Sequence, residues 1–499
     1  MKKMKADDNK EDYDRAYTTR VMLILAMLIM IVMYVEGMLT PSLLSIASEF
    51  KVSISQVSLL LSVYLVTGVS ISPIVGKLGD IYGKKKLLVI VLLIYAVAVL
   101  STGFSPNFTY MLVSRGIQGI GLTVMPLGMS LVREEFPRRL VPKAQALLSA
   151  MFGAGFAVSL PLGSLVSNDL GWRYTYHTAF PFVFALVAIA YFYIRESAYR
   201  RPGTRVDYIG AGVFAVALGL VVFGLSEGAL IGWTSITVVG MILSGVILFI
   251  PTFIYERSYS RRGLEAILDS RLLSKRNVWI PNVVLAISGL GMFLAMQALT
   301  YRFESPTPYG FSLSILYTGL SLVPFAIGTL IFGPITGSII TRIGVKQMSV
   351  VGPLVAAAGF ILEATQPSFI MTLLYGFIIG SGLSIMNASV INILVLSVEP
   401  RDMGLATSMN GTFRNLGSSV GASLAGAILA TYSIATLSGS PYDIPIPTHL
   451  AYEISFLLAF AAFILSAIIV AFAHEVIFFK HNTVASKESE IPEKQPDTA

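Results

Sequence analysis

Long apolar runs recur along the whole chain, and each is long enough to cross a bilayer as a helix, which takes about 20 residues. Strands of a membrane barrel would instead alternate apolar and polar residues over about ten positions, and these runs do not alternate. Several runs are rich in Gly, Ala and Ser, which let helices approach closely in lipid. We therefore predict an all-α multi-pass membrane protein with fourteen transmembrane helices. Their approximate bounds are 20–44, 55–76, 87–105, 108–131, 143–167, 177–195, 208–227, 234–256, 278–301, 312–338, 347–365, 369–396, 403–430 and 451–473.

The composition agrees with lipid as the surrounding medium. Of the 499 residues, 55% are hydrophobic and only 13% are charged, whereas soluble proteins carry about 25% charged residues. The absence of cysteine excludes disulfides and thiolate metal sites. None of the four histidines has metal-ligand spacing, so we expect no metal site.

Positive charges are distributed unevenly between the loops. Thirty of the 35 Lys and Arg residues fall in the N-terminal segment, in the loops that the helix count places on the same side, and in the C-terminal segment; three fall in the opposite loops. This asymmetry fits the positive-inside rule and places both termini in the cytoplasm. It also accounts for the net charge of +7, so no nucleic-acid partner is needed to explain it. No small-residue cleavage site follows the charged N-terminus, which we interpret as a retained cytosolic tail.

Two pairs of similar segments share one offset along the chain. "GKLGDIYGKK" at 76 resembles "GSIITRIGVK" at 337, and "GIGLTVMP" at 119 resembles "GSGLSIMN" at 380, each 261 residues later. Duplicated halves around a midplane site are typical of secondary transporters. The predicted organisation is a cytosolic tail (1–19), a six-helix bundle (20–195), an inserted two-helix segment with cytosolic linkers (196–276), a second six-helix bundle (277–473) and a cytosolic tail (474–499).

The loop "GKLGDIYGKKK" at 76–86 lies between two predicted helices. Its first two glycines permit close helix packing, and Gly83 suits a tight turn. Asp80 can face a neighbouring helix N-terminus and pair with a basic residue, and such contacts can form in one global state and break in another. The alternative is that the lysines only fix the topology. A phosphate-binding loop would need a preceding strand and a Gly-Lys-Ser/Thr ending, and neither is present. The residues of this predicted switch loop are Gly76, Gly79, Asp80, Gly83, Lys84 and Lys85.

Three polar residues within apolar helices are candidates for proton coupling. Arg115 lies several residues inside its run, where an arginine should face a cavity or a partner, and Gln118 shares its helix face. Glu36, in the first run, is the acid placed most deeply by sequence, which suits a proton carrier. The alternatives are an interfacial arginine that holds lipid or a carbonyl, and a structural acid near the outer end.

Other buried polar positions lie in the second half. Their polar side chains can bridge helices or face the substrate cavity, and the sequence leaves both interpretations open. They are Gln297, Asn387, Asn410 and Arg414.

Several of these segments resemble the motifs of one family. "GKLGDIYGKKK" is similar to the signature loop of the major facilitator superfamily, "LVSRGIQGIG" at 112–121 to its fourth-helix motif and "GFAVSLPLGSL" at 155–165 to its fifth-helix antiporter motif. "RVDYIGAGVFAVALGLVVFGLSEG" at 205–228 and "FRNLGSSVGASL" at 413–424 resemble helices of the fourteen-helix drug:proton antiporter branch.

The resemblance implies the major-facilitator fold, with two six-helix bundles and two inserted helices. It implies a role for the Asp80 loop in switching between outward- and inward-open forms, and a role for Arg115 in proton coupling. It also implies that the fifth-helix positions Gly155, Pro161 and Gly163 accompany antiport.

We therefore expect a secondary transporter of the plasma membrane, not an enzyme. It would export small hydrophobic or cationic drug-like compounds by alternating access, as a monomer, driven by the proton gradient without a cofactor. One alternative keeps the fold but changes the direction or the cargo, to a metabolite, a siderophore or a lipid. Another is a membrane-embedded sensor or enzyme, against which stand the missing catalytic motifs and the short loops.

Overall fold

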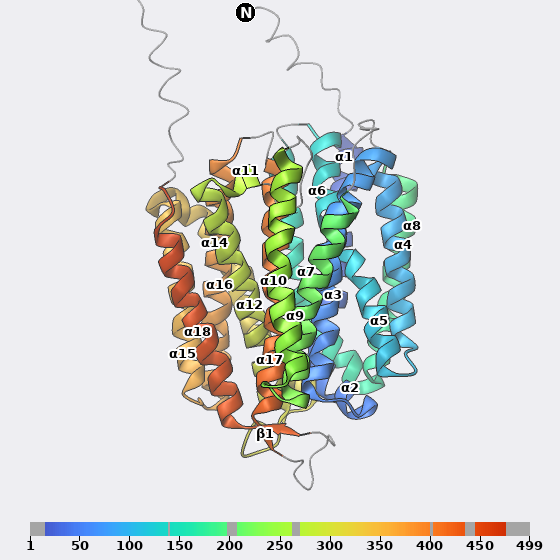
Figure 1. Cartoon of the computed structure of the whole chain (residues 1–499). Coiled ribbons are helices and arrows are strands. Elements are labelled where there is room, and N and C mark those ends of the chain that lie inside the picture. Colours follow the sequence, from blue (N-terminus) through green and yellow to red (C-terminus); the bar gives the residue numbers. More distant parts are fainter. Residues whose placement is uncertain are drawn as a thin grey trace, which may run out of the picture.

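Helices cross the molecule side by side in the computed structural model (Figure 1), which describes residues 15–137, 140–196, 207–261, 270–399, 403–434 and 445–475. Within this part, eleven helical segments are long and apolar enough to span a membrane. The only strands described, β1 (Ser433–Ile434) and β2 (Ile446–Pro447), form a two-residue antiparallel pair. The all-α class is therefore confirmed for the described residues.

The first half of the chain contains all the helices up to residue 193. They are α1 (Arg15–Gly37), η1 (Thr40–Ser42), α2 (Leu43–Phe50), α3 (Ile54–Tyr82), α4 (Lys84–Gly103), α5 (Phe108–Gln118), η2 (Gly119–Thr123), α6 (Val124–Glu135), α7 (Val141–Leu170) and α8 (Trp172–Tyr193).

The second half follows an inserted pair, α9 (Tyr208–Ile231) and α10 (Ile236–Arg261). Its helices are α11 (Ser270–Leu273), α12 (Arg276–Glu304), α13 (Ile315–Ser321), α14 (Val323–Ile343), α15 (Val345–Ala364), α16 (Phe369–Ser397), α17 (Met403–Thr431) and α18 (His449–Ala471).

Each of the fourteen predicted runs coincides with helix, but three are interrupted. The run 20–44 breaks after Gly37, and helix resumes at η1 and α2. The run 108–131 contains the 3-10 segment η2, where the glycine-rich stretch "GIGLT" departs from regular α-helix. The run 312–338 is divided at Leu322. The runs 108–131, 143–167 and 403–430 are not among the eleven apolar spans, so fourteen crossings stay a prediction.

Local sequence signals set several helix ends. Ser53 starts α3 with a capping box, in which Gln56 N donates to Ser53 Oγ at 3.1 Å and Ser53 N donates to Gln56 Oε1 at 3.0 Å. Asn107 caps α5 and Asp207 caps α9 with one hydrogen bond each: Tyr110 N donates to Asn107 Oδ1 and Gly210 N donates to Asp207 Oδ1, both at 2.8 Å. Gly83 ends α3 with φ +107°, a conformation that favours glycine.

The repeat predicted from the sequence has a structural counterpart in two turns. Gly83 joins α3 to α4, and Gly344 joins α14 to α15 with φ +108°. The two glycines therefore have the same left-handed conformation at matching positions of the two halves. We call the end of the bundle that contains the Gly83 turn the turn end, and the end that contains α2 the α2 end.

The two halves pack against each other near the α2 end. Ser58 Oγ on α3 donates to Gln297 Oε1 on α12 at 2.6 Å, and Ser62 Oγ lies 2.8 Å from Ser423 Oγ on α17. A β-carbon at Gly319 of α13 would lie 2.0 Å from Ser164 Oγ of α7. The backbone of α13 therefore packs directly against the Ser164 side chain of α7. Small residues thus bring the halves together here. We call these contacts the α2-end seam.

The inserted pair lies along one side of this boundary. In Figure 1 the green helices α9 and α10 pass in front of the junction between the blue-to-cyan first half and the yellow-to-red second half. α9 contacts both α3 and α17, and Ser55 Oγ of α3 donates to the Ser226 carbonyl of α9 at 2.6 Å. The inserted pair therefore touches both halves.

Candidate functional site

The predicted switch loop forms an ion cluster within the first half. Lys84 Nζ lies 2.8 Å from Asp80 Oδ1 and also pairs with Glu134 of α6. The Lys84 side chain is only 5% exposed. One buried ammonium group thus links the end of α3, the start of α4 and the end of α6.

The N-terminus of α4 is capped by an acid that the sequence did not indicate. Both carboxylate oxygens of Glu196, just after α8, accept hydrogen bonds at 3.0 Å from the backbone N–H groups of Lys85 and Lys86. A carboxylate at a helix N-terminus stabilises the helix dipole. In this conformation Glu196 therefore fills the place that the sequence analysis considered for Asp80. Lys85 Nζ lies over the Tyr191 ring, 5.4 Å from its centroid.

The glycines of this loop differ in their surroundings. Gly83 has the expected positive φ. A β-carbon at Gly79 would lie 3.2 Å from Leu127 Cδ2, so close packing occurs there, but one at Gly76 would meet nothing within 4 Å. The prediction that Gly76 permits close helix packing is therefore wrong for this conformation.

Arg115 and Gln118 form a fixed polar pair inside the first half. The Arg115 side chain is fully buried; its Nε donates to the Leu60 carbonyl at 3.3 Å and its Nη1 to Gln118 Oε1 at 2.9 Å. Gln118 Nε2 in turn donates to the Ala98 carbonyl at 3.2 Å. The guanidinium lies 4.7 Å from the centroid of the Tyr64 ring. These contacts hold Arg115 in place while its Nη2 has no hydrogen-bond partner among the described residues.

Glu36 lies near the end of α1 and is 6% exposed. Two positive charges act on its carboxylate: Arg115 from the first half and Arg414, on α17, from the second. No hydrogen bond to the Glu36 carboxylate occurs among the described residues. The structure therefore brings together one acid and two arginines across the boundary between the halves.

Three tyrosines around this cluster were missed by the sequence analysis. Tyr64, Tyr95 and Tyr176 are fully buried, and all three interact electrostatically with Arg115. A tyrosine in an apolar run gives no sequence signal that separates an interior position from a membrane-interface position.

The fifth-helix motif packs against α1. A β-carbon at Gly155 would lie 2.3 Å from the Met30 carbonyl oxygen, and one at Gly163 would lie 2.6 Å from Met38 Cβ. Pro161 lies inside α7 between them. The two glycines thus allow α7 to run directly against the helix that carries Glu36.

This contact predicts a difference between two glycines on the same helix. Gly155→Ala should destabilise the protein by about 1–3 kcal/mol because its methyl group overpacks the α1–α7 contact. Gly153→Ala is the matched control, since a β-carbon there would meet nothing within 4 Å. Thermal unfolding of the purified variants in detergent measures the difference; equal midpoints would contradict the packing account.

The second-half amides connect helices. Gln297 accepts from Ser58 and donates from Nε2 to the Ala422 carbonyl at 2.8 Å. Asn387 Oδ1 accepts from Ser288 Oγ at 3.0 Å, and Asn410 Nδ2 donates to Asn282 Oδ1 at 3.1 Å. These contacts support the helix-bridging interpretation for three of the four predicted positions.

A buried ion pair in the second half was also missed. Arg302 Nη1 lies 3.2 Å from Glu363 Oε2, and both side chains are almost fully buried. Near them, at the last residue of α12, Glu304 is 1% exposed. The predicted span 278–301 ends one residue before Arg302, whereas α12 continues to Glu304.

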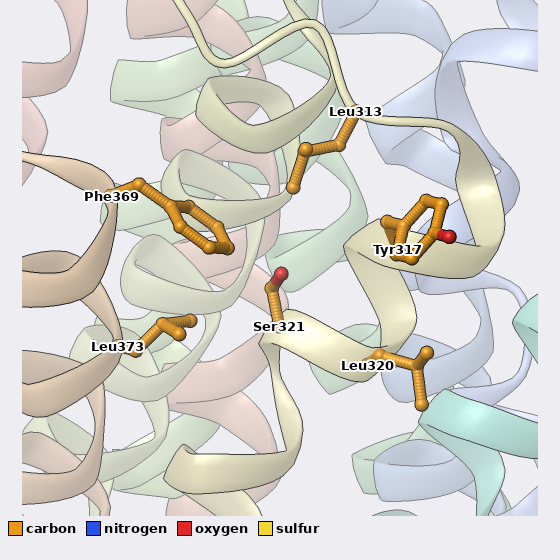
Figure 2. A pocket seen from close by; sticks show the side chains of 6 residues that line it. All are labelled: Leu313, Tyr317, Leu320, Ser321, Phe369 and Leu373. Carbon is orange, nitrogen blue, oxygen red and sulfur yellow. The ribbon is translucent and has the colours of Figure 1, made fainter.

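An apolar cavity of about 430 Å³ lies away from the Glu36 cluster, between α13 and α16. Figure 2 shows the side chains that line it. All are apolar except Ser321 and the hydroxyl group of Tyr317. Leu320 and Tyr317 are exposed on the outer face of the bundle. This groove therefore opens to the side of the molecule, and its apolar lining suits lipid.

Comparison with known proteins identifies the family. The sequence model of the Major Facilitator Superfamily matches residues 25–303, 201–422 and 282–496. The chain belongs to this superfamily. The match places the chain in a family of transporters and confirms the resemblance that the motifs indicated.

Several similar proteins carry the names of multidrug transporters. The chain is 26% identical over 384 residues to the multidrug transporter protein MdtP of Bacillus subtilis, covering 75% of this chain and 69% of that protein. It is 25% identical over 378 residues to multidrug resistance protein 3 of the same organism, covering 73% and 70%. The relation to the multidrug efflux type is thus supported at modest identity.

A solved structure agrees with the fold. A bacterial homologue of the human lysosomal transporter Spinster, in an inward-facing and unoccupied conformation, superposes with a TM-score of 0.65. The match covers 92% of this chain and 98% of that chain at 13% identity. At this identity the likeness concerns the fold alone.

Proposed function

We propose that this transporter exports hydrophobic and cationic drug-like compounds in exchange for protons, by alternating access between its two halves. The observation that carries the proposal is the placement of Glu36. It is a buried acid attracted by one arginine from each half, so its charge affects how the halves interact. The multidrug relatives support the cargo class.

The contacts of Arg115 suit a proton exchange at Glu36. When Glu36 is ionised, its charge offsets that of Arg115 and of Arg414. When Glu36 is neutral, Arg115 still donates to Leu60 and Gln118, so the arginine keeps its position. Proton binding therefore removes an attraction that links the halves without displacing the residues that surround it.

The α2-end seam supports a cycle of two conformations. Ser58 and Ser62 join the halves on this side, as a state closed at the α2 end requires. We propose that the α2 end faces outward, that substrate enters from the turn end, and that protonation of Glu36 from outside accompanies substrate release. The energy source is the proton gradient, with no cofactor.

The topology of the proposal follows the loop charges. We propose fourteen crossings, with both termini in the cytoplasm and the chain in the plasma membrane as a monomer.

The test is transport by the purified protein in sealed liposomes. Reversing an imposed pH gradient should reverse the movement of a lipophilic cationic dye, and collapsing the gradient with a protonophore should stop net movement. Dye movement at the same rate and in the same direction with and without the pH gradient would refute proton coupling. A gradient-dependent flux of a metabolite or lipid, with none of the dye, would instead favour another cargo on the same fold.

A further inference from the structure

A second buried acid lies close to the α2-end seam, and the proposed mechanism above does not use it. Both carboxyl oxygens of Glu304 are buried and have no hydrogen-bond partner of good geometry among the described residues. The loop after α12 folds back on the end of this helix: Ser312 N donates to the Ser305 carbonyl at 2.9 Å, and Leu313 N donates to the Phe303 carbonyl at 2.8 Å. Glu304, between the two acceptor residues, is 1% exposed.

Among the residues that the structure describes, no positively charged group acts on Glu304. Tyr301, on the preceding helical turn, and Tyr452, on α18, interact with it electrostatically. The Thr318 hydroxyl of α13 also acts on the Glu304 carboxyl group. Neither group has a hydrogen-bond partner of good geometry among the described residues.

The nearest arginine in sequence is engaged elsewhere. Arg302 turns toward α15, where it pairs with Glu363 and donates to the Pro367 carbonyl at 3.0 Å. The charge of Arg302 is thereby offset by Glu363, so Arg302 does not compensate Glu304. A carboxylate buried without a partner or a counter-charge costs several kcal/mol, so Glu304 is neutral in this conformation.

Glu304 is coupled to the seam through a short helix. Thr318 and Gly319 are consecutive residues of α13: Thr318 faces the acid, whereas Gly319 packs against Ser164 of the other half. Tyr317 and Leu320 of α13 line the groove in Figure 2 and are exposed among the described residues. The groove gives α13 room to shift on that side.

We propose that Glu304 is a second proton-binding site, filled when the α2-end seam is closed and emptied when it opens. Separation of α13 from α7 admits water to the carboxyl group, which then ionises. Because the closed state binds one more proton than the open state, low pH favours closure and high pH favours opening. The inference rests on the proposed alternating movement of the halves, but not on Glu36 or on any cargo.

Spin-label distances across the seam test the proposal. The chain contains no cysteine, so Asn168→Cys after the seam on α7 and Thr365→Cys at the end of α15 introduce the only labels, both at exposed positions. The measurement is made without substrate in a Glu36→Gln background, which removes titration of Glu36. The ratio of the open to the closed population should rise by up to about tenfold per pH unit.

Variants of Glu304 decide whether this acid is the proton site. Glu304→Gln should keep the seam closed at every pH, whereas Glu304→Asp should retain a pH response. Glu453→Gln, a half-buried acid on α18, is the matched control and should behave as the parent does. An unchanged pH response in Glu304→Gln, or no response in the parent, would overturn the proposal.

Two further measurements decide the outcome if one variant fails or if another cation is bound. If Glu304→Gln does not fold, the parent and Glu304→Asp still separate the outcomes, because a pH-independent parent refutes the site. Replacing sodium by choline at constant pH should change nothing, and a sodium-dependent population would overturn the proton assignment. Failure of dye transport in liposomes would leave this pH response intact, so the two proposals fail separately.

Discussion

Replacing Glu36 with glutamine is expected to abolish dye transport driven by a pH gradient, to the level of protein-free liposomes. Glutamine has the size of the protonated acid but cannot ionise, so one half of the proton cycle is lost. Arg115 keeps its contacts to Leu60, Gln118 and Tyr64, and dye binding in the absence of a gradient should therefore persist.

Two variants separate a coupling role from a structural one. Glu36→Asp retains the charge and should retain partial gradient-driven transport. Glu227→Gln makes the same exchange in α9, away from the arginines, and should transport normally. Removing one member of a buried charged group can cost about 3–5 kcal/mol, so thermal unfolding must accompany the assay. Gradient-driven transport by a folded Glu36→Gln protein would rule out Glu36 as the proton carrier.

Asp80→Asn is expected to lower transport about tenfold or more while leaving the amount of inserted protein unchanged. In the present conformation Asp80 pairs with Lys84, which also pairs with Glu134. Asp80 is 26% exposed, and Lys84 keeps its pair with Glu134 when Asp80 is replaced, so losing this ion pair should not unfold the protein. If Asp80 changes partner in the other conformation, a difference of about 1.4 kcal/mol between the states shifts their ratio tenfold.

The control for the switch loop is its exposed lysine. Lys86→Gln removes a positive charge from the same turn while its backbone N–H still bonds to Glu196, so transport should stay near normal. Rates of dye efflux in liposomes with matched protein content provide the comparison. Equal loss in both variants would mean that the effect is not specific to Asp80, and normal transport by Asp80→Asn would refute the switch role.

The length of the apolar runs was sufficient to predict the helical architecture. Hydrophobic length located each helix, because a lipid-spanning segment requires a long apolar run whatever its tertiary contacts are. Helix ends were less predictable. α12 extends to Glu304, past the predicted end at 301, because its last turn is covered by the following loop and not by lipid.

The polar interior was predicted where a charged or amide side chain interrupts an apolar run. Glu36 and Arg115 were found in this way, and the structure brings them together with Arg414. Tyr64, Tyr95 and Tyr176 were not found because tyrosine is ordinary in membrane helices. Glu196 and Glu134 lie at helix ends, where an acid carries no signal until its partner across the fold is known.

The central claim is that substrate and proton compete through Glu36, and proton release on substrate binding tests it most directly. Purified protein in weakly buffered detergent solution, mixed with saturating dye, should release protons, and the pH change is read with an indicator. The wild type and Glu227→Gln should release similar amounts, and Glu36→Gln should release markedly less. Equal release from Glu36→Gln and the wild type, with dye bound by both, would contradict the account.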